Sequence, residues 1–298
     1  MKNQTFGVEI ELTGITRCQA ASIIAKHFNT GSIHEGGSYD KYEVMDNKGR
    51  KWTAMSDGSI RTEKKDGTQV GSAYSCEIVT PICKWEDIED IQEIVRKLRH
   101  KGAIANSSCG IHVHIGAERH TAKTLRNLVN IMASKEDLIF KALGVSQTRA
   151  DRWCKKVRQE FVERMNKTKP TSTDSVEQIW YGGRTQRYHH YDSSRYHALN
   201  LHSLWQGKGI EFRCFNGTTH AGKIKTYIQL CLAISNQALT QNGASAKKTI
   251  TTNEKYTFRT WLLRLGMIGE EFETARKFLL ENLDGDIAFR NGRTRVAA

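Results

Sequence analysis

Residues 6–12 read Phe-Gly-Val-Glu-Ile-Glu-Leu, and this alternation of apolar and acidic side chains decides how the chain begins to fold. In an extended strand, successive side chains point to opposite faces of the sheet, so the aliphatic residues share one face. Glu9 and Glu11 then lie on the other face, one pleat repeat apart. The segment predicts a strand with an apolar core face and two neighbouring carboxylates behind it.

Three further segments repeat this alternation and carry charged or imidazole groups on the face opposite the aliphatic residues. Their polar residues are Glu77 in SCEIVTP, His112 and His114 in CGIHVHIG, and Glu211 and Arg213 in GIEFRCF. A single such strand is most often an amphipathic strand with a solvated face, but four together exceed what a merely solvated sheet needs. If the strands share one sheet, the carboxylates converge and need cations. Oxygen-rich ligation with an imidazole suits Mg²⁺ or Mn²⁺.

The rest of the chain predicts a mostly antiparallel sheet backed by helices, of the α+β class. Alternation of period two predicts further strands at residues 39–46, 50–56 and 196–202. Apolar residues at helical spacing predict helices at residues 84–101, 119–143 and 222–240.

A basic segment interrupts this pattern. Residues 147–167 predict one basic amphipathic helix, followed by a loop at 169–178, and we interpret about 144–190 as an insertion. The catalytic domain is expected to span residues 1–245, and a helical extension residues 246–298. Because the chain has only two prolines and no long Gly/Ser-rich linker, we expect one catalytic unit rather than a string of modules.

Composition narrows the class of protein. The chain has 298 residues, 38% of them apolar, and a formal net charge of +13. A basic surface suits nucleic acid, nucleotide phosphates or acidic substrates, so the charge alone does not choose among them. Because no apolar run approaches the roughly 20 residues of a membrane span, we expect a cytoplasmic protein. Seven cysteines without any CxxC pair predict reduced thiols that serve in packing.

The ordered motifs of this chain resemble those of the amidoligase family, a branch of the glutamine synthetase and glutamate–cysteine ligase fold. The motifs that carry the resemblance are FGVEIEL, SDGSI, EIVTP, CGIHVHIG, RYHALNLHSL and GIEFRCFNGT, from residue 6 to about residue 219. The resemblance implies a glutamine synthetase-like sheet with the active site on one face and helices on the other. It also implies a ligase that uses ATP and Mg²⁺ or Mn²⁺ to join a carboxylate to an amine through an acyl phosphate.

The resemblance also implies which residues bind metal and nucleotide. The residues implied for one metal are Glu9, His112 and Glu211, and those implied for the other are Glu11 and Glu77. A further carboxylate of the second metal would be Glu63 or Asp57. The residues implied for the nucleotide are Arg195 and Arg213 at the ATP phosphates, with His114 near the nucleotide or the reacting carboxylate.

Three residues are the candidates for catalysis. Arg213 would offset charge on the transferred phosphoryl group, with His114 beside the reacting groups. Asp57 would take the proton of the attacking ammonium, although its place in SDGSI is also typical of a turn former. Lys155 and Lys156 are either solvated helix residues or part of the substrate mouth.

Other functions remain open from the sequence. A phosphagen-type kinase of the same fold would phosphorylate a nitrogen and stop there. A metal-dependent hydrolase could use the histidines and glutamates, and a nucleic-acid-binding protein could use the positive charge. The cluster of His189, His190, His197 and His202 could suggest zinc, but no cysteine accompanies it at ligand spacing. The expected partners are small-molecule or peptide carboxylates and amines, with neither membrane nor nucleic acid, and the sequence does not indicate an oligomeric state.

Overall fold

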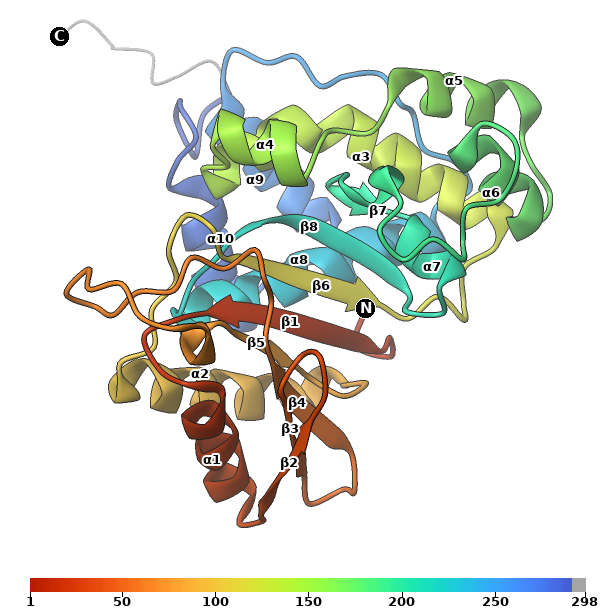
Figure 1. The fold of residues 1–298 in the computed structure, drawn as a ribbon. Coiled ribbons are helices and arrows are strands. Elements are labelled where there is room, and N and C mark those ends of the chain that lie inside the picture. The colour runs from red at the N-terminus through yellow and green to blue at the C-terminus, as the bar shows by residue number, and fades with distance from the viewer. Residues whose placement is uncertain (291–298) are drawn as a thin grey trace, which may run out of the picture. The chain divides into compact units, whose positions relative to one another are not determined.

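The computed structural model describes residues 1–290, which divide into two compact units. The strand-rich unit comprises Lys2–Ile115 and Phe215–Ile228. The helix-rich unit comprises Met1, Gly116–Cys214 and the described residues from Gln229 onward. Figure 1 shows the elements of both in chain order by colour.

The strand-rich unit is built on antiparallel strands that follow one another in the order β2-β3-β4-β5-β1-β6 (Figure 1). Their bounds are β1 (Phe6–Leu12), β2 (Ser32–Gly36), β3 (Lys41–Met45), β4 (Lys51–Met55), β5 (Cys76–Val79) and β6 (Gly110–Ile115). Five of these strands confirm the predictions from alternation. The sequence analysis missed β2, because its side chains are almost all exposed and follow no apolar alternation.

Two helices cover strands of this unit. Helix α1 (Arg17–Phe28) packs on β3, β4 and β5, and α2 (Ile88–Lys101), preceded by the 3₁₀ turn η2 (Trp85–Asp87), packs on α1. The prediction of a helix at 84–101 is confirmed, whereas α1 was missed. Its start is nevertheless encoded locally, because Thr16 and Gln19 form a capping box.

The helix-rich unit contains one short strand pair and many helices. Strand β7 (Leu199–Asn200) pairs antiparallel with β8 (Ile210–Asn216). The helices are α3 (Ala122–Leu143), α4 (Gln147–Trp153), α5 (Gln159–Thr168), α6 (Thr173–Tyr181), α7 (His202–Trp205), α9 (Glu254–Arg264) and α10 (Glu273–Leu280), with the 3₁₀ turns η3 (Ser193–Arg195) and η4 (Glu270–Phe272). Helix α8 (Ala221–Thr240) confirms the helix predicted at 222–240. The α+β class with mostly antiparallel pairing is confirmed.

The structure corrects the prediction of a single helix at residues 147–167. Helix α4 ends at Trp153 and α5 begins at Gln159. Between them the backbone N–H of Lys155 donates to the carbonyl of Tyr196 (2.9 Å), and the Lys155 carbonyl accepts from the N–H of Ala198 (2.8 Å). This pairing holds the chain extended where the amphipathic pattern continues, so one predicted helix becomes two.

Two neighbouring predictions were also wrong in extent. The loop predicted at 169–178 contains the start of α6, whose N-cap Ser172 accepts a hydrogen bond from the N–H of Ser175 (3.2 Å). The strand predicted at 196–202 shrinks to Leu199–Asn200, because the Asn200 side chain accepts from the N–H of His202 (2.9 Å) and turns the chain into α7. A local side-chain hydrogen bond decides the outcome in both places: it starts a helix in the predicted loop, and it ends the predicted strand early.

The seven cysteines, all within the described residues, are free thiols. Six are buried, and only Cys18, in the first turn of α1, is exposed. Burial raises the pKa of the Cys76 and Cys83 thiols to about 12. The six buried residues confirm the packing interpretation. Within residues 1–290, the helices are too short or too polar to cross a membrane.

Candidate metal centre

The polar side chains of β1, β5 and β6 are buried instead of solvated. Glu11 is 5% exposed, Glu77 8% and His112 6%. Glu9 is less enclosed, with 22% of its side chain exposed. The reading of these strands as simple amphipathic strands with a solvated face is therefore wrong, since burying a carboxylate requires compensating partners.

The register of the strands brings two of the predicted metal ligands face to face. Glu11 lies directly opposite Glu77 in the β1–β5 pair. Like charges in opposite positions of adjacent strands destabilise the sheet. The N–H of Gly110 donates to one carboxylate oxygen of Glu11 (2.5 Å), while the other lies 3.7 Å from Nε2 of His112.

Glu11, Glu77 and His112 together form a candidate metal centre. One ligand atom from each lies within 4.8 Å of the others. Two carboxylates and one imidazole make an oxygen-rich donor set that fits Mg²⁺ or Mn²⁺ and leaves positions for water and phosphate oxygens. The site therefore fits the kind of metal that the sequence suggested.

Glu9 stabilises the imidazole side of this centre. One of its oxygens lies 3.0 Å from Nδ1 of His112 and the other 3.3 Å from Nε2 of His114. Burial opposes ionisation of Glu9, but the two histidines outweigh it and hold its pKa well below the usual range. A carboxylate on one imidazole nitrogen fixes the ring so that the other nitrogen can face a metal. The role of Glu9 as a metal ligand stays a prediction, and so does the place of His114 near a nucleotide.

The two candidates for a further carboxylate have other contacts. Asp57 accepts a hydrogen bond from the N–H of Ser59 (2.6 Å), which is the geometry of a turn former. Glu63 accepts from the Asn106 side chain (2.9 Å) and lies 3.5 Å from Nε of Arg61. The group of Glu11 and Glu77 is completed by His112 and includes neither of these carboxylates.

In the helix-rich unit, Glu211 and Arg213 of β8 form a buried ion pair. Nη1 of Arg213 donates to one Glu211 oxygen (2.5 Å), and the Asn200 side chain donates to the other (2.6 Å). Glu211 is 3% exposed and Arg213 6%. The role of Glu211 as a metal ligand stays a prediction, and so does that of Arg213 at a phosphate.

Arg195 and Arg213 lie near the same aromatic ring. Their guanidinium carbons are 5.8 and 5.9 Å from the ring centroid of Tyr196. Contact with an aromatic ring orients an arginine without using up its donors. The sequence analysis did not single out Tyr196 or Asn200, which contact Arg213 and Glu211, although both lie in the motif RYHALNLHSL. Binding of ATP phosphates by Arg195 stays a prediction.

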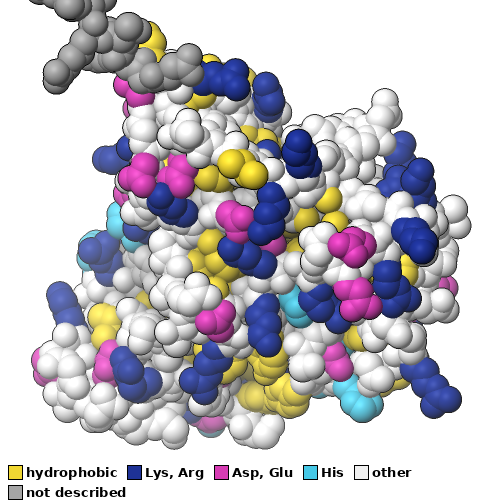
Figure 2. Space-filling model, turned by 90° about the horizontal axis from the view of Figure 1, so that it is seen from above, with side chains coloured by type: hydrophobic (Ala, Val, Ile, Leu, Met, Phe, Trp, Pro, Cys, Tyr) yellow, Lys and Arg dark blue, Asp and Glu magenta, His cyan; other side chains and the backbone are white. Residues whose placement is uncertain are grey.

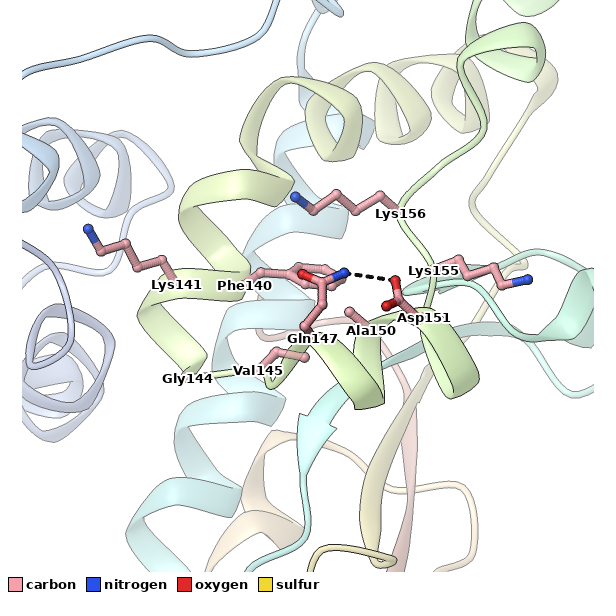
Figure 3. Close-up of a pocket in the computed structure, with 9 residues that line it drawn as sticks. All are labelled: Phe140, Lys141, Gly144, Val145, Gln147, Ala150, Asp151, Lys155 and Lys156. Atoms are coloured by element: carbon pink, nitrogen blue, oxygen red, sulfur yellow. Dashed lines mark hydrogen bonds between the residues drawn. The ribbon is translucent and has the colours of Figure 1, made fainter.

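Lys155 and Lys156 lie at a pocket of about 560 Å³ between the end of α3 and α4. In Figure 3, Lys156 extends over Phe140, whereas Lys155 points away from the pocket. Lys156 forms an ion pair with Asp137. Gln147 and Asp151 face each other across a hydrogen bond of 2.8 Å (Figure 3). A role for either lysine at a substrate stays a prediction.

The histidines that could have suggested zinc separate into two kinds. His189 and His190 are exposed, and His197 and His202 are buried. Nδ1 of His197 lies 2.7 Å from the carbonyl of Ser194, and Nδ1 of His202 lies 2.5 Å from the hydroxyl of Tyr181. Burial lowers the pKa of both His197 and His202, which favours neutral rings that hydrogen-bond within the unit.

Comparison with known families agrees with the geometry. The family described as "Putative amidoligase enzyme" matches residues 2–235. No curated protein matches the chain. The matched range contains every motif of the resemblance and the whole of the candidate metal centre. The chain therefore belongs to the amidoligase family.

Proposed function

We propose that this protein is a carboxylate–amine ligase that uses ATP and Mg²⁺ or Mn²⁺, with a glutamine synthetase-like arrangement of its sheet. The observation that carries the proposal is the opposed, buried pair of Glu11 and Glu77 with His112 beside it. Two facing, buried carboxylates beside an imidazole would be stabilised by a divalent cation, and this supports the proposal.

The proposed reaction has two steps. A carboxylate oxygen of the acid attacks the γ-phosphorus of ATP, the bond to the β,γ-bridging oxygen breaks, and ADP leaves with an acyl phosphate formed. The amine nitrogen then attacks the acyl carbon, the carbon–oxygen bond to phosphate breaks, and the amide and inorganic phosphate are released. The bound cations would offset the negative charge of the phosphates.

The chain's own residues would bind and orient the reactants. Glu11, Glu77 and His112 would hold the metal, with Glu9 orienting the imidazole. Arg195 and Arg213 would bind phosphate oxygens, because a guanidinium fork matches their geometry. Asp57 would accept the proton that the ammonium group loses.

The substrates would be small-molecule or peptide carboxylates and amines. The positive net charge would favour acidic substrates and nucleotide phosphates. On the face drawn in Figure 2, Lys and Arg side chains are interspersed with Asp and Glu and do not form one continuous basic band. A continuous basic stripe is the usual mark of a nucleic-acid surface.

Hydroxylamine tests the proposal, because it captures an acyl phosphate as a hydroxamate. Purified protein is incubated with ATP, Mg²⁺, hydroxylamine and pooled carboxylic acids, and hydroxamate and ADP are measured by mass spectrometry and a coupled assay. We expect equal amounts of hydroxamate and ADP with the parent, and neither with Glu77→Gln.

Two other results would replace the ligase with a rival. A stable N-phosphorylated product, with ADP but never hydroxamate, would identify a phosphagen-type kinase. Metal-dependent cleavage of a substrate without any nucleotide would identify a hydrolase.

A further inference from the structure

Arg17 occupies a position that disfavours a buried cation. It is the first residue of α1, and its side chain is 6% exposed. The N-terminus of a helix carries partial positive charge, and the first turn of α1 contains no acidic residue. Other parts of the chain must therefore stabilise this guanidinium.

Arg17 is stabilised by two segments that lie far from it in sequence. Nη1 of Arg17 donates to the carbonyls of Ser72 and Ser75, both at 2.7 Å. Nε donates to the carbonyl and to a carboxylate oxygen of Asp40 (3.2 and 3.1 Å), and Nη2 bonds to the same carboxylate. The fork thus joins the start of α1, the β2–β3 turn and the turn η1 (Ser72–Tyr74).

The contacts continue from Ser75 towards the candidate centre. Ser75 is 5% exposed, and its hydroxyl donates to the carbonyl of Asp57 (2.6 Å) and accepts from its N–H (2.9 Å). Two residues after Ser75 comes Glu77, opposite Glu11. Arg17 therefore holds the backbone at the point where the loop from Asp57 enters β5.

We propose that Arg17 is a positioning residue that fixes the start of β5, so that the Glu77 carboxylate faces Glu11 and His112 in the geometry that binds a divalent cation. This inference rests on the proposed metal-dependent function. Arg17 acts through the backbone of Ser72 and Ser75, to whose carbonyls it donates. Lysine cannot replace it, because a single ammonium group cannot reproduce a fork that bonds three carbonyls and a carboxylate together.

A matched control is available in the same unit. Arg50 also joins distant segments, with Nε donating to Asp46 (2.9 Å) and Nη1 to Asp87 (2.8 Å). Its partners lie at the β3–β4 turn and the start of α2. Arg50→Lys therefore loses a comparable set of structural bonds without changing the entry into β5.

The experiment measures Mn²⁺ binding to the full chain by titration calorimetry, without nucleotide, for the parent, Arg17→Lys, Arg50→Lys and Glu77→Gln. We expect Arg17→Lys to weaken Mn²⁺ binding by about tenfold or more, the range seen when a group that orients metal ligands is lost. We expect Arg50→Lys to bind like the parent, and Glu77→Gln to lose binding.

Each contrary result has a distinct meaning. If the parent binds no Mn²⁺, or Glu77→Gln binds as well as the parent, the proposed metal function fails. If Glu77→Gln loses binding but Arg17→Lys retains the parent affinity, the metal function stands and the role of Arg17 is overturned. Equal weakening in Arg17→Lys and Arg50→Lys would also overturn it, because the effect would then be general.

A second variant covers the case in which Arg17→Lys does not fold. Asp40→Asn keeps the size of the side chain and removes the charge that fixes the guanidinium, with 43% of the Asp40 side chain exposed. We expect it to fold and to weaken Mn²⁺ binding by about threefold, less than the loss of the whole fork. Parent affinity in Asp40→Asn would overturn the proposal.

Discussion

Two buried acidic pairs in the strand-rich unit have different surroundings. Asp46 and Asp87 are 5% and 1% exposed, and both bond to Arg50, which lies between them. Lys48 adds a bond of 2.7 Å to Asp87. Glu11 and Glu77 are buried to a similar degree, but they face each other across a strand pair with the imidazole of His112 beside them.

We interpret the difference as one between buried charge that stabilises the fold and buried charge that is proposed to bind a metal. Burial opposes ionisation of Asp87, yet its bonds to Arg50 and Lys48 outweigh that effect and hold its pKa well below the usual range. The chain thus supplies permanent cations to one pair. An imidazole, unlike a guanidinium, can give up its proton and bind a metal. The second pair therefore suits a cation taken from solution.

The largest expected effect is at the structural pair. Asp87→Asn leaves Arg50 and Lys48 without one of their anions, so we expect the free energy of unfolding to fall by about 3–5 kcal/mol. Mn²⁺ binding should be unchanged. Urea unfolding measures the stability, and titration calorimetry measures Mn²⁺ binding. A variant that is as stable as the parent but binds metal differently would contradict the distinction between the two pairs.

The same variant should change how the free energy of unfolding depends on pH under acidic conditions. The folded-state pKa of Asp87 is depressed, so its contribution is present above the unfolded pKa of about 3.9 and is lost as the pH falls below it. We expect the difference in unfolding free energy between parent and Asp87→Asn to shrink below pH 4. A difference that stays constant down to pH 2 would contradict this.

An opposite result is expected at the candidate metal centre. Glu77→Gln relieves the repulsion from Glu11, so the metal-free melting temperature should equal or exceed that of the parent. Saturating Mn²⁺ should stabilise the parent by about 2.7 kcal/mol at a hundred times the Kd and leave the variant unshifted. Thermal melts with and without metal decide this, and a large loss of apo stability would place Glu77 with the structural acids.

Glu211 provides an intermediate case in the other unit. Because it accepts bonds from Arg213 and Asn200, Glu211→Gln should cost about 2 kcal/mol, the scale of a hydrogen bond to a charged group. Chemical unfolding measures that cost. If the variant is as stable as the parent, Glu211 behaves like Glu77 and its predicted metal role gains support.

The smallest effect is expected at the surface. Lys156 and Asp137 form an ion pair with 45% and 48% of their side chains exposed, so Lys156→Ala should lower stability by less than about 1 kcal/mol. Lys155→Ala, whose side chain points away from the pocket, is the control and should change stability even less (Figure 3). Urea unfolding in low salt tests both, and a loss above 2 kcal/mol would contradict the surface interpretation.

The sequence predicted the faces of the strands well, because alternation depends only on neighbouring residues. It placed Glu9 and Glu11 away from Val8 and Ile10, and the structure confirms that arrangement. It could not predict that Glu11 lies opposite Glu77, because that register depends on a connection of 63 intervening residues and on contacts such as those of Arg17.

The same limit explains the predictions that failed. The amphipathic pattern of residues 147–167 is continuous, but the helix is divided where Lys155 pairs with Tyr196 and Ala198. The periodicity of a segment gives no information about a hydrogen-bond partner that lies far away in sequence. The contacts of His112 could not be predicted either. Its Nδ1 lies beside Glu9, while the ring also lies near the carboxylates of Glu11 and Glu77.

The uneven burial of the cysteines makes this chain convenient for spectroscopy. In the native fold only Cys18 is open to a maleimide or a similar electrophile, while the six buried thiols should react only after unfolding. Cys18 directly follows Arg17, so a fluorophore attached there would sit beside the contacts that fix the start of β5. The natural sequence therefore already contains a single labelling position for following that region by fluorescence, without an engineered cysteine.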